Sequence, residues 1–145
     1  MIFVKSRLIG LILVSVGCMF LLGCGESEPP AVDVQGKVTF KGKPLSNAAI
    51  WFTSPKTGAG FSGNLNQDGA YTVKLLQVRP GDTFQVSFAN REPVEGEPTK
   101  LDGAGVPVLE MPDLPGKYFD PAQSGLTANV ESLEPQTFDF TLESK

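Results

Sequence analysis

Apolar and polar residues alternate along most of the chain between residues 32 and 142. In the first run, 32–40, one face carries Val32, Val34, Val38 and Phe40 and the other carries polar residues. Successive side chains of a β-strand point to opposite faces, so this pattern predicts a half-buried strand. The same pattern recurs at 45–52, 61–65, 71–75, 83–88, 126–130 and 137–142. We therefore expect an all-β chain, and a single antiparallel seven-stranded β-sandwich is the simplest fold that buries these faces.

Turn motifs separate the alternating runs. Gly42 follows the first run, and Asp68-Gly69 stands between the runs 61–65 and 71–75. An Asp-Gly pair between alternating runs favours a β-hairpin, because the tight turn requires positive φ at its centre. The sequence therefore predicts that these two runs pair with each other.

The segment 89–125 has a different character. It holds six of the twelve prolines of the chain, together with several glycines and acidic residues. Proline cannot donate a hydrogen bond to a sheet, so a central strand is excluded here. We expect a Pro/Gly-rich loop, in which only 106–111 is suited to brief pairing at a sheet edge. Loops of this length are usually functional or mobile.

The first 23 residues form a pattern of their own. Lys5 and Arg7 precede an uncharged apolar run, 8–23, which ends in Leu21-Leu22-Gly23-Cys24. This layout is typical of a bacterial signal peptide, and its last four residues resemble the lipobox of bacterial lipoproteins. The resemblance implies cleavage before Cys24, attachment of diacylglycerol to its thiol, and acylation of the new amino terminus by a fatty acid such as palmitate. Residues 24–31 would then be a flexible tether to the membrane.

Two alternatives to a lipid anchor remain open at this stage. An uncleaved membrane-spanning helix needs about 20 apolar residues, whereas 8–23 supplies sixteen. A secreted protein would carry Cys24 as a lone thiol. By resemblance to lipoproteins of Gram-negative bacteria, Gly25 in place of an Asp favours the outer membrane. The expected location is therefore the bacterial cell envelope.

Composition narrows the range of functions. Without Lys5 and Arg7 the chain has ten basic and sixteen acidic side chains, a net charge of −6, which argues against a nucleic-acid partner. Cys18 leaves with the signal peptide and Cys24 is consumed by lipidation, so no internal disulfide is expected. The chain contains no histidine, and it therefore lacks the usual catalytic base and the commonest transition-metal ligand.

Two stretches carry a resemblance to known modules. Val34-x-Gly36-x-Val38, Gly42-x-Pro44-Leu45 and Asp68-Gly69-x-Tyr71-x-Val73 resemble the carboxypeptidase regulatory-like domain, a transthyretin/prealbumin-like β-sandwich. The segment 114–130 is similar to the end of small envelope lipoproteins that carry this module. The resemblance implies one domain over 32–145 without catalytic activity. Hydroxyisourate hydrolases of the same fold rely on histidines, which are absent here.

Three aromatic residues are candidate ligand contacts. Trp51 is out of phase with the apolar face of 45–52, so we expect it on the outer face, available to a sugar ring or a protein, unless the long loop covers it. Tyr118 and Phe119 lie in the loop, where they either face a ligand or, for Tyr118, fill one end of the core. The loop carboxylates lack the Asp-x-Asp-x-Asp-Gly spacing of a calcium loop, so no metal or other cofactor is expected.

These observations predict a lipid-anchored envelope protein without enzymatic activity. Its expected role is structural or in assembly, through contacts with an envelope protein and with the membrane through the anchor. The alternative is a surface module that binds glycan or peptide through Trp51, Tyr118 or Phe119. Lipidation at Cys24 is the one modification that the sequence predicts.

Overall fold

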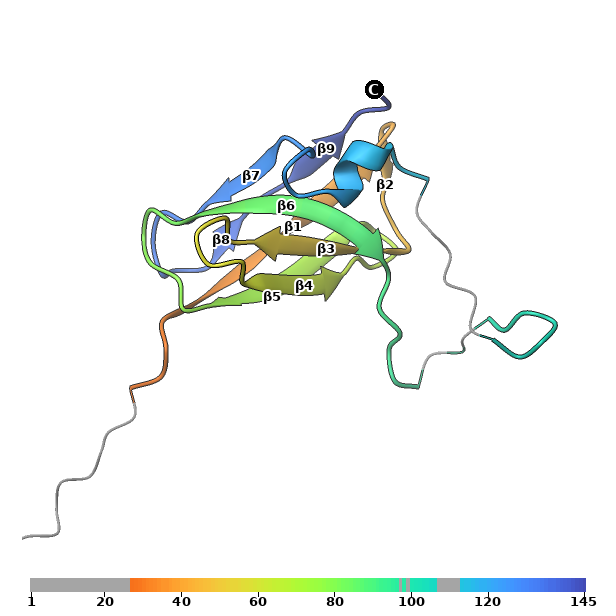
Figure 1. Ribbon diagram of the computed structural model, residues 1–145, viewed down its shortest axis with the longest axis horizontal. Helices are drawn as coiled ribbons and strands as arrows, with labels where there is room; N and C mark the ends of the chain where they lie inside the picture. The colour runs from red at the N-terminus through yellow and green to blue at the C-terminus, as the bar shows by residue number, and fades with distance from the viewer. Residues whose placement is uncertain (1–26, 97, 99, 107–112) are drawn as a thin grey trace, which may run out of the picture.

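The computed structural model describes residues 27–96, 98, 100–106 and 113–145. These residues form an all-β domain of two antiparallel-rich sheets, consistent with a β-sandwich (Figure 1). A single turn of 3₁₀-helix, η1 (Gly116–Phe119), accompanies the strands. The strands are β1 (Ala31–Phe40), β2 (Lys43–Pro44), β3 (Ala48–Thr53), β4 (Gly60–Asn64), β5 (Ala70–Leu76), β6 (Thr83–Asn90), β7 (Leu126–Asn129), β8 (Gln136–Thr137) and β9 (Phe140–Leu142).

The first sheet is built around β1. Along one side β1 pairs antiparallel with two strands: residues 31–37 pair with β5, and the last two residues of β1 pair with the short β2. Along the other side it pairs with β8 and β9, and these two pairings are parallel. The expectation of a purely antiparallel fold is therefore wrong for the end of the chain. The reason is topological: the segment after β7 enters the first sheet at the end where β1 also begins, so both strands run in the same direction.

The second sheet is antiparallel throughout, in the order β4-β3-β6-β7. In its centre β3 pairs with β4 on one side and with β6 on the other. Strand β7 adds four residues to the free side of β6. The described residues thus contain nine strands rather than the expected seven, because the turn after β1 forms β2 and the last expected strand is divided into β8 and β9.

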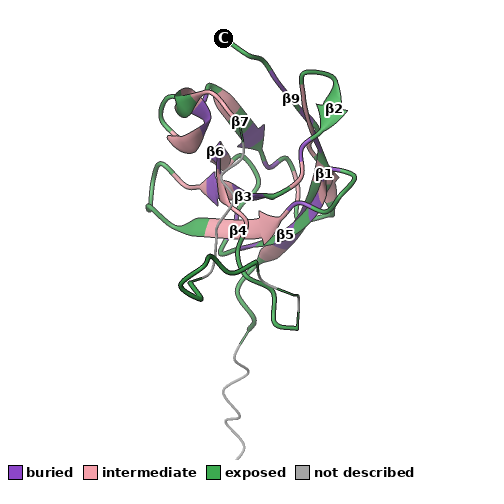
Figure 2. Cartoon of the chain, turned by 90° about the vertical axis from the view of Figure 1, so that its right-hand side faces the viewer, coloured by how far each residue is buried: buried purple, intermediate pink, exposed green. Residues whose placement is uncertain are grey.

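The core lies between the two sheets, as Figure 2 shows by its buried segments. The alternation of the sequence predicts its members well. The buried residues that the pattern assigned to inward faces are Val32, Val34, Val38, Ala48, Ile50, Phe52, Tyr71, Val73, Leu75, Phe84, Val86, Phe88, Phe140 and Leu142. Phe40 and Phe138 pack against this cluster but are only partly buried. Both lie where their strand ends or is interrupted.

The two predicted turns have different outcomes. Lys41 and Gly42 both have positive φ, 52° and 73°, and they form the expected tight turn between β1 and β2. Gly69 also has positive φ, 71°. The strands that flank it, however, belong to different sheets, so the predicted hairpin between β4 and β5 is wrong. The turn carries the chain from one sheet to the other, with Asn66 Oδ1 accepting hydrogen bonds from the N–H groups of Asp68 and Ala70.

The Pro/Gly-rich segment predicted over 89–125 includes the last two residues of β6, Ala89 and Asn90, and ends before β7. Its described part contains η1, and Ser124 fixes the segment to the second sheet by donating from Oγ to the Val86 carbonyl oxygen. Most of the segment predicted to pair at a sheet edge, residues 107–111, lies outside the described residues. So do Cys24 and the signal peptide. No helix among the described residues is long and apolar enough to span a membrane.

Candidate functional site

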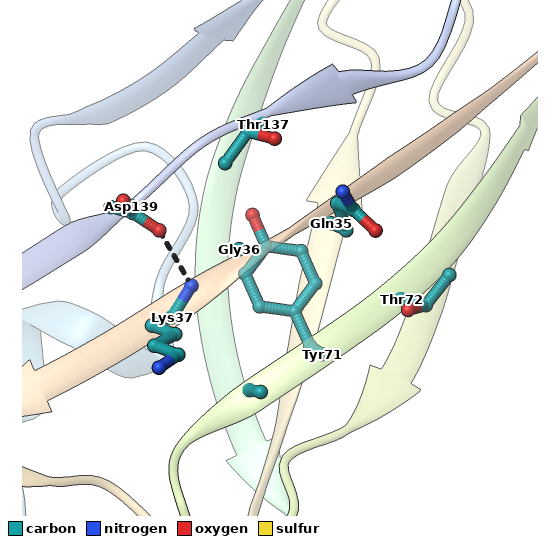
Figure 3. A pocket seen from close by; sticks show the side chains of 8 residues that line it. Gln35, Gly36, Lys37, Tyr71, Thr72, Thr137 and Asp139 are labelled. Atoms are coloured by element: carbon teal, nitrogen blue, oxygen red, sulfur yellow. Dashed lines mark hydrogen bonds between the residues drawn. The ribbon is translucent and has the colours of Figure 1, made fainter.

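The outer face of the first sheet holds a shallow polar depression of about 490 Å³. Strands β5, β1 and β8 place three polar side chains in one row across it, since Gln35 is paired with Thr72 on one side and with Thr137 on the other. Lys37 and Asp139 lie beside this row, two residues further along (Figure 3). Hydrogen-bonding groups from three strands therefore meet on one exposed surface.

The depression forms where the parallel pairing with β1 is interrupted between β8 and β9. There the Lys37 N–H donates to the side chain of Asp139, 2.8 Å to Oδ1, instead of to a backbone carbonyl (Figure 3). The Phe138 N–H still donates to the Gln35 carbonyl oxygen, at 2.9 Å. The Phe138 carbonyl oxygen turns inward, where it accepts a hydrogen bond of 2.7 Å from the Tyr71 hydroxyl.

Gly36 makes this arrangement possible. A Cβ atom at this position would lie 1.9 Å from the Phe138 carbonyl oxygen, so no residue with a side chain fits there. Gly36 is paired with Tyr71, whose ring lies across the space that a side chain would fill (Figure 3). A glycine inside an alternating strand often marks such a close approach of backbone. This is the sequence signal that could have indicated the cluster of Gly36, Tyr71 and Phe138.

Electrostatics keep Tyr71 in its neutral form. Burial raises the pKa of the Tyr71 hydroxyl far above its ordinary value, and the negative charge of Asp139 raises it further. A neutral phenol donates one hydrogen bond, and here the Phe138 carbonyl oxygen accepts it. Tyr71 therefore acts in the fold as a fixed donor and not as a base.

The chemistry of the depression is that of recognition by hydrogen bonds. Gln35 offers an amide, Thr72 and Thr137 offer hydroxyls, and Lys37 offers an ammonium group, all on exposed side chains. Such a surface fits a ligand rich in hydroxyl or amide groups, a glycan or an extended peptide. The residues of the depression were not among the candidates that the sequence indicated.

Trp51 lies on β3 in the second sheet, half-buried, with Ser62 and Ser87 as its partners on the neighbouring strands. Two of its ring carbons would lie 3.4 Å from a Cβ at Gly60, so the indole covers that glycine. Part of the ring remains exposed. Trp51 is on a different sheet from the polar depression, so the fold does not bring the two into one site.

The chain after β6 folds back over the second sheet beside Trp51. The side chain of Asn64 bonds both backbone groups of Glu92, donating to its carbonyl oxygen at 2.9 Å and accepting from its N–H at 2.8 Å. Ser62 also donates to the Glu92 carboxylate at 3.0 Å. These bonds fix the first residues of the loop across the edge strand β4.

Tyr118 and Phe119, two of the predicted ligand contacts, pack within the fold. Tyr118 is buried in the core, and its hydroxyl accepts a hydrogen bond of 2.9 Å from the Glu143 N–H, just after β9. Phe119, the next residue of η1, is half-buried. Tyr118 thus joins η1 to the end of the first sheet. Neither residue lines the polar depression.

A second group of contacts lies at the end of the domain where the chain enters. Asp82 accepts from the Arg79 N–H at 2.9 Å and from Lys56 Nζ at 3.1 Å. The bond from Arg79 and, after it, the bond from Lys56 lower the pKa of the Asp82 carboxyl below its ordinary value. Asp82 is therefore an ionised link between the loops that follow β3 and β5.

Within the described ranges no three Asp, Glu or Cys side chains lie close enough together to hold a metal ion. Comparison of the sequence with protein-family models and with curated proteins gave no match.

Proposed function

We propose that this protein is a lipid-anchored, non-catalytic β-sandwich protein of the bacterial cell envelope with a structural or assembly role. The anchor is supported by the positive, then apolar, leader that ends in Leu21-Leu22-Gly23-Cys24. The domain supports it as well, because β1 begins at Ala31, only seven residues after Cys24. A lipid on Cys24 would therefore hold the folded domain close to the membrane.

One observation carries the structural role: the side chains best suited to chemistry are engaged in holding the fold. The hydroxyls of Tyr71 and Tyr118 bond backbone groups of the last strands. Ser124 bonds the Val86 carbonyl oxygen, and Asp139 accepts from the Lys37 N–H. The absence of histidine from the sequence removes the usual base that would activate a hydroxyl nucleophile.

We infer further that the domain is a carboxypeptidase regulatory-like, transthyretin-like module. The glycines of the motif that carries this resemblance occupy positions with demanding geometry. Gly36 lies against Phe138, and a Cβ at Gly69 would lie 2.4 Å from the Val38 carbonyl oxygen. These glycines therefore serve the fold. A fold of this kind does not by itself imply an activity.

The anchor is tested by Cys24→Ser, with Cys18→Ser in the leader as the matched control. The first variant should lose lipid labelling and leave the membrane fraction, and the second should behave as the unchanged protein. Cys24→Ser protein that stays in the membrane with residues 1–23 attached would contradict the lipid anchor.

The structural role is tested by cross-linking in the native envelope and identification of the attached proteins. Reproducible turnover of a substrate, lost on mutation of a loop carboxylate such as Asp120, would contradict the non-catalytic role.

Recognition of a glycan or peptide is the second candidate function. The row of Thr72, Gln35 and Thr137 favours it, as does the partly exposed indole of Trp51. Tryptophan fluorescence of the purified domain should then shift with one member of a sugar and peptide panel. Because Trp51 is the single tryptophan of the chain, binding to Trp51→Phe is measured by calorimetry, and the substitution should abolish it. Binding that survives Trp51→Phe but is lost in Gln35→Ala would assign the ligand to the polar depression instead.

A further inference from the structure

The end of the domain at which the chain enters is built from three loops. They connect β3 to β4, β5 to β6, and β7 to β8, and Figure 1 shows them on the same side as the start of β1. The described part of the Pro/Gly-rich loop and the turn between β1 and β2 lie at the opposite end. We call the three loops, residues 54–59, 77–82 and 130–135, together with Leu76 at the end of β5, the entry surface.

The chain is held at this surface before β1 begins. The Val78 N–H donates to the Pro30 carbonyl oxygen at 3.2 Å, so Pro30 is attached to the loop after β5. Five residues, 25–29, then separate Pro30 from Cys24. Fully extended, a connection of this length reaches at most about 20 Å. If Cys24 carries lipid, as we propose above, the entry surface is restricted to the neighbourhood of the membrane.

Two exposed leucines lie at this end. Leu76 is 44% exposed and Leu133 is 46% exposed. Leu76 is paired with Ala31, the first residue of β1. Leu133 lies in the loop between β7 and β8, three residues before Gln136, which is paired with Val34 of β1. The remaining large apolar side chains that are exposed in the described part of the chain, Val94, Leu101 and Val106, belong to the opposite loop.

The entry surface is held together as one unit. Val130 exchanges two backbone hydrogen bonds with the loop after β5, donating to the Asp82 carbonyl oxygen at 2.8 Å and accepting from the Gly81 N–H at 2.7 Å. Gln136 donates to the Ser132 carbonyl oxygen at 2.7 Å, which closes the loop that carries Leu133. The ion pair between Lys56 and Asp82 connects the loop after β3 to the loop after β5. The leucines are thus presented by a firm surface.

The charges of this surface are mixed. The three loops carry two cations, Lys56 and Arg79, and three anions, Asp82, Glu131 and Glu134. Such a surface has no excess of positive charge to attract anionic lipid. Its chemistry fits a zwitterionic phospholipid surface, where two leucines enter the headgroup region and the charged side chains remain in water.

We infer that the entry surface docks on the phospholipid bilayer, with Leu76 and Leu133 in contact with the headgroup region. The inference rests on the lipid anchor proposed above. The anchor supplies the affinity, and the leucines set the orientation. The described part of the Pro/Gly-rich loop and the turn between β1 and β2 then face away from the membrane, where a protein partner can reach them.

The test uses the lipidated protein that begins at Cys24, reconstituted in phosphatidylcholine vesicles that contain a lipid-borne quencher. A fluorophore is attached through Glu134→Cys on the entry surface or, as the control, through Lys43→Cys at the opposite end. Cys24 is blocked by its thioether. We expect quenching at position 134 to exceed quenching at position 43 by about threefold or more, since headgroup contact places the probe next to the quencher.

A second pair of proteins isolates the leucines. Adding Leu76→Ser and Leu133→Ser to Glu134→Cys should lower the quenching at position 134 to the level that the short tether alone produces, while circular dichroism and vesicle binding stay unchanged. Quenching at position 134 that does not fall when the leucines are removed would overturn the docking. Equal quenching at positions 134 and 43 in vesicle-bound protein would overturn the docking and leave the anchor intact. Protein that does not remain with the vesicles would contradict the anchor, and the docking with it.

Discussion

The hydroxyl of Tyr71 donates a hydrogen bond of 2.7 Å to the backbone carbonyl oxygen of Phe138, and the two residues are 67 positions apart in the sequence. The bond crosses β1 at Gly36 and joins β5 to the connection between β8 and β9. It satisfies a carbonyl group that the interrupted pairing would otherwise leave without a partner. Three strands of the first sheet are therefore fixed by one side chain.

Removing this hydroxyl should destabilise the protein measurably. In Tyr71→Phe the Phe138 carbonyl oxygen loses its donor in a partly buried position, and we expect the free energy of unfolding to fall by about 1–2 kcal/mol. Urea unfolding followed by fluorescence measures it. Tyr118→Phe is the matched comparison, because it removes a second part-buried hydroxyl bond, the one that the hydroxyl accepts from the Glu143 N–H, and should cost a similar amount. Unchanged stability of Tyr71→Phe would contradict the role given to its hydroxyl.

The same hydroxyl should make the fold sensitive to alkali. Burial, and then the charge of Asp139, raise the pKa of Tyr71 above the ordinary value of 10.0. A raised pKa in the folded state means that the unfolded chain releases the proton first, so stability is full below pH 10 and falls as pH rises beyond it. Tyr71→Phe should therefore show a flatter dependence of unfolding free energy on pH between about 9 and 11 than the unchanged protein. If the unfolding free energies of the two proteins depend on pH in the same way, the pKa of Tyr71 is not raised in the folded protein.

Gly36→Ala should be more harmful than its size suggests. The added Cβ would lie 1.9 Å from the Phe138 carbonyl oxygen, so β8 and β9 must move away from β1. We expect a loss of about 3 kcal/mol, at the upper end for an overpacked site. Gly103→Ala is the control, because nothing lies within 4 Å of its added Cβ. Thermal unfolding of the two variants compares them, and equal midpoints would show that the first sheet tolerates the displacement.

Asp82→Asn should weaken the entry surface and change its response to acid. Its pKa is lowered by the bond from the Arg79 N–H and by Lys56. A carboxyl with a lowered pKa stabilises the fold above its ordinary pKa, and this contribution disappears as pH falls through the folded value. The variant should be less stable at pH 7 and lose less stability on acidification below pH 4. Lys56→Met removes the bond from Lys56 and keeps the bond from the Arg79 N–H. Its free energy of unfolding at pH 7 should therefore lie between those of Asp82→Asn and the unchanged protein.

Two phenylalanines predicted on the same inward face should respond differently to aspartate. Phe140 is 8% exposed, so Phe140→Asp buries an unpaired charge and should unfold the domain. Phe40 is partly buried at the end of β1, where an aspartate can reach water, so Phe40→Asp should lower the stability without abolishing folding. Far-ultraviolet circular dichroism distinguishes the two outcomes. Unfolding by both substitutions would show that the end of β1 is as enclosed as β9.

The candidate site shows where the sequence was informative and where it was not. Trp51, Tyr118 and Phe119 attract interest in a sequence because they are large aromatics, but Tyr118 is a core residue and Trp51 lies on a different sheet from the polar depression. The residues of the depression are common polar residues of ordinary strands. Their meeting depends on strand neighbours, and nothing in the local sequence of Gln35 or Thr137 records that they are paired.

The sequence by itself determined the main strand-forming runs and most of the side chains that face the core. Alternation of apolar and polar residues indicates which side chains of a strand are buried, and it does so whichever strand lies beside it. The runs 32–40 and 83–88 were therefore predicted to within two residues of β1 and β6. Only the tertiary structure decided the pairing: the parallel direction of β8 and β9, the passage between sheets at Gly69, and the bond from Tyr71 to Phe138. The physical reason is that alternation fixes the face of a strand, whereas its neighbour is chosen by the summed burial and hydrogen bonding of residues far apart in the chain.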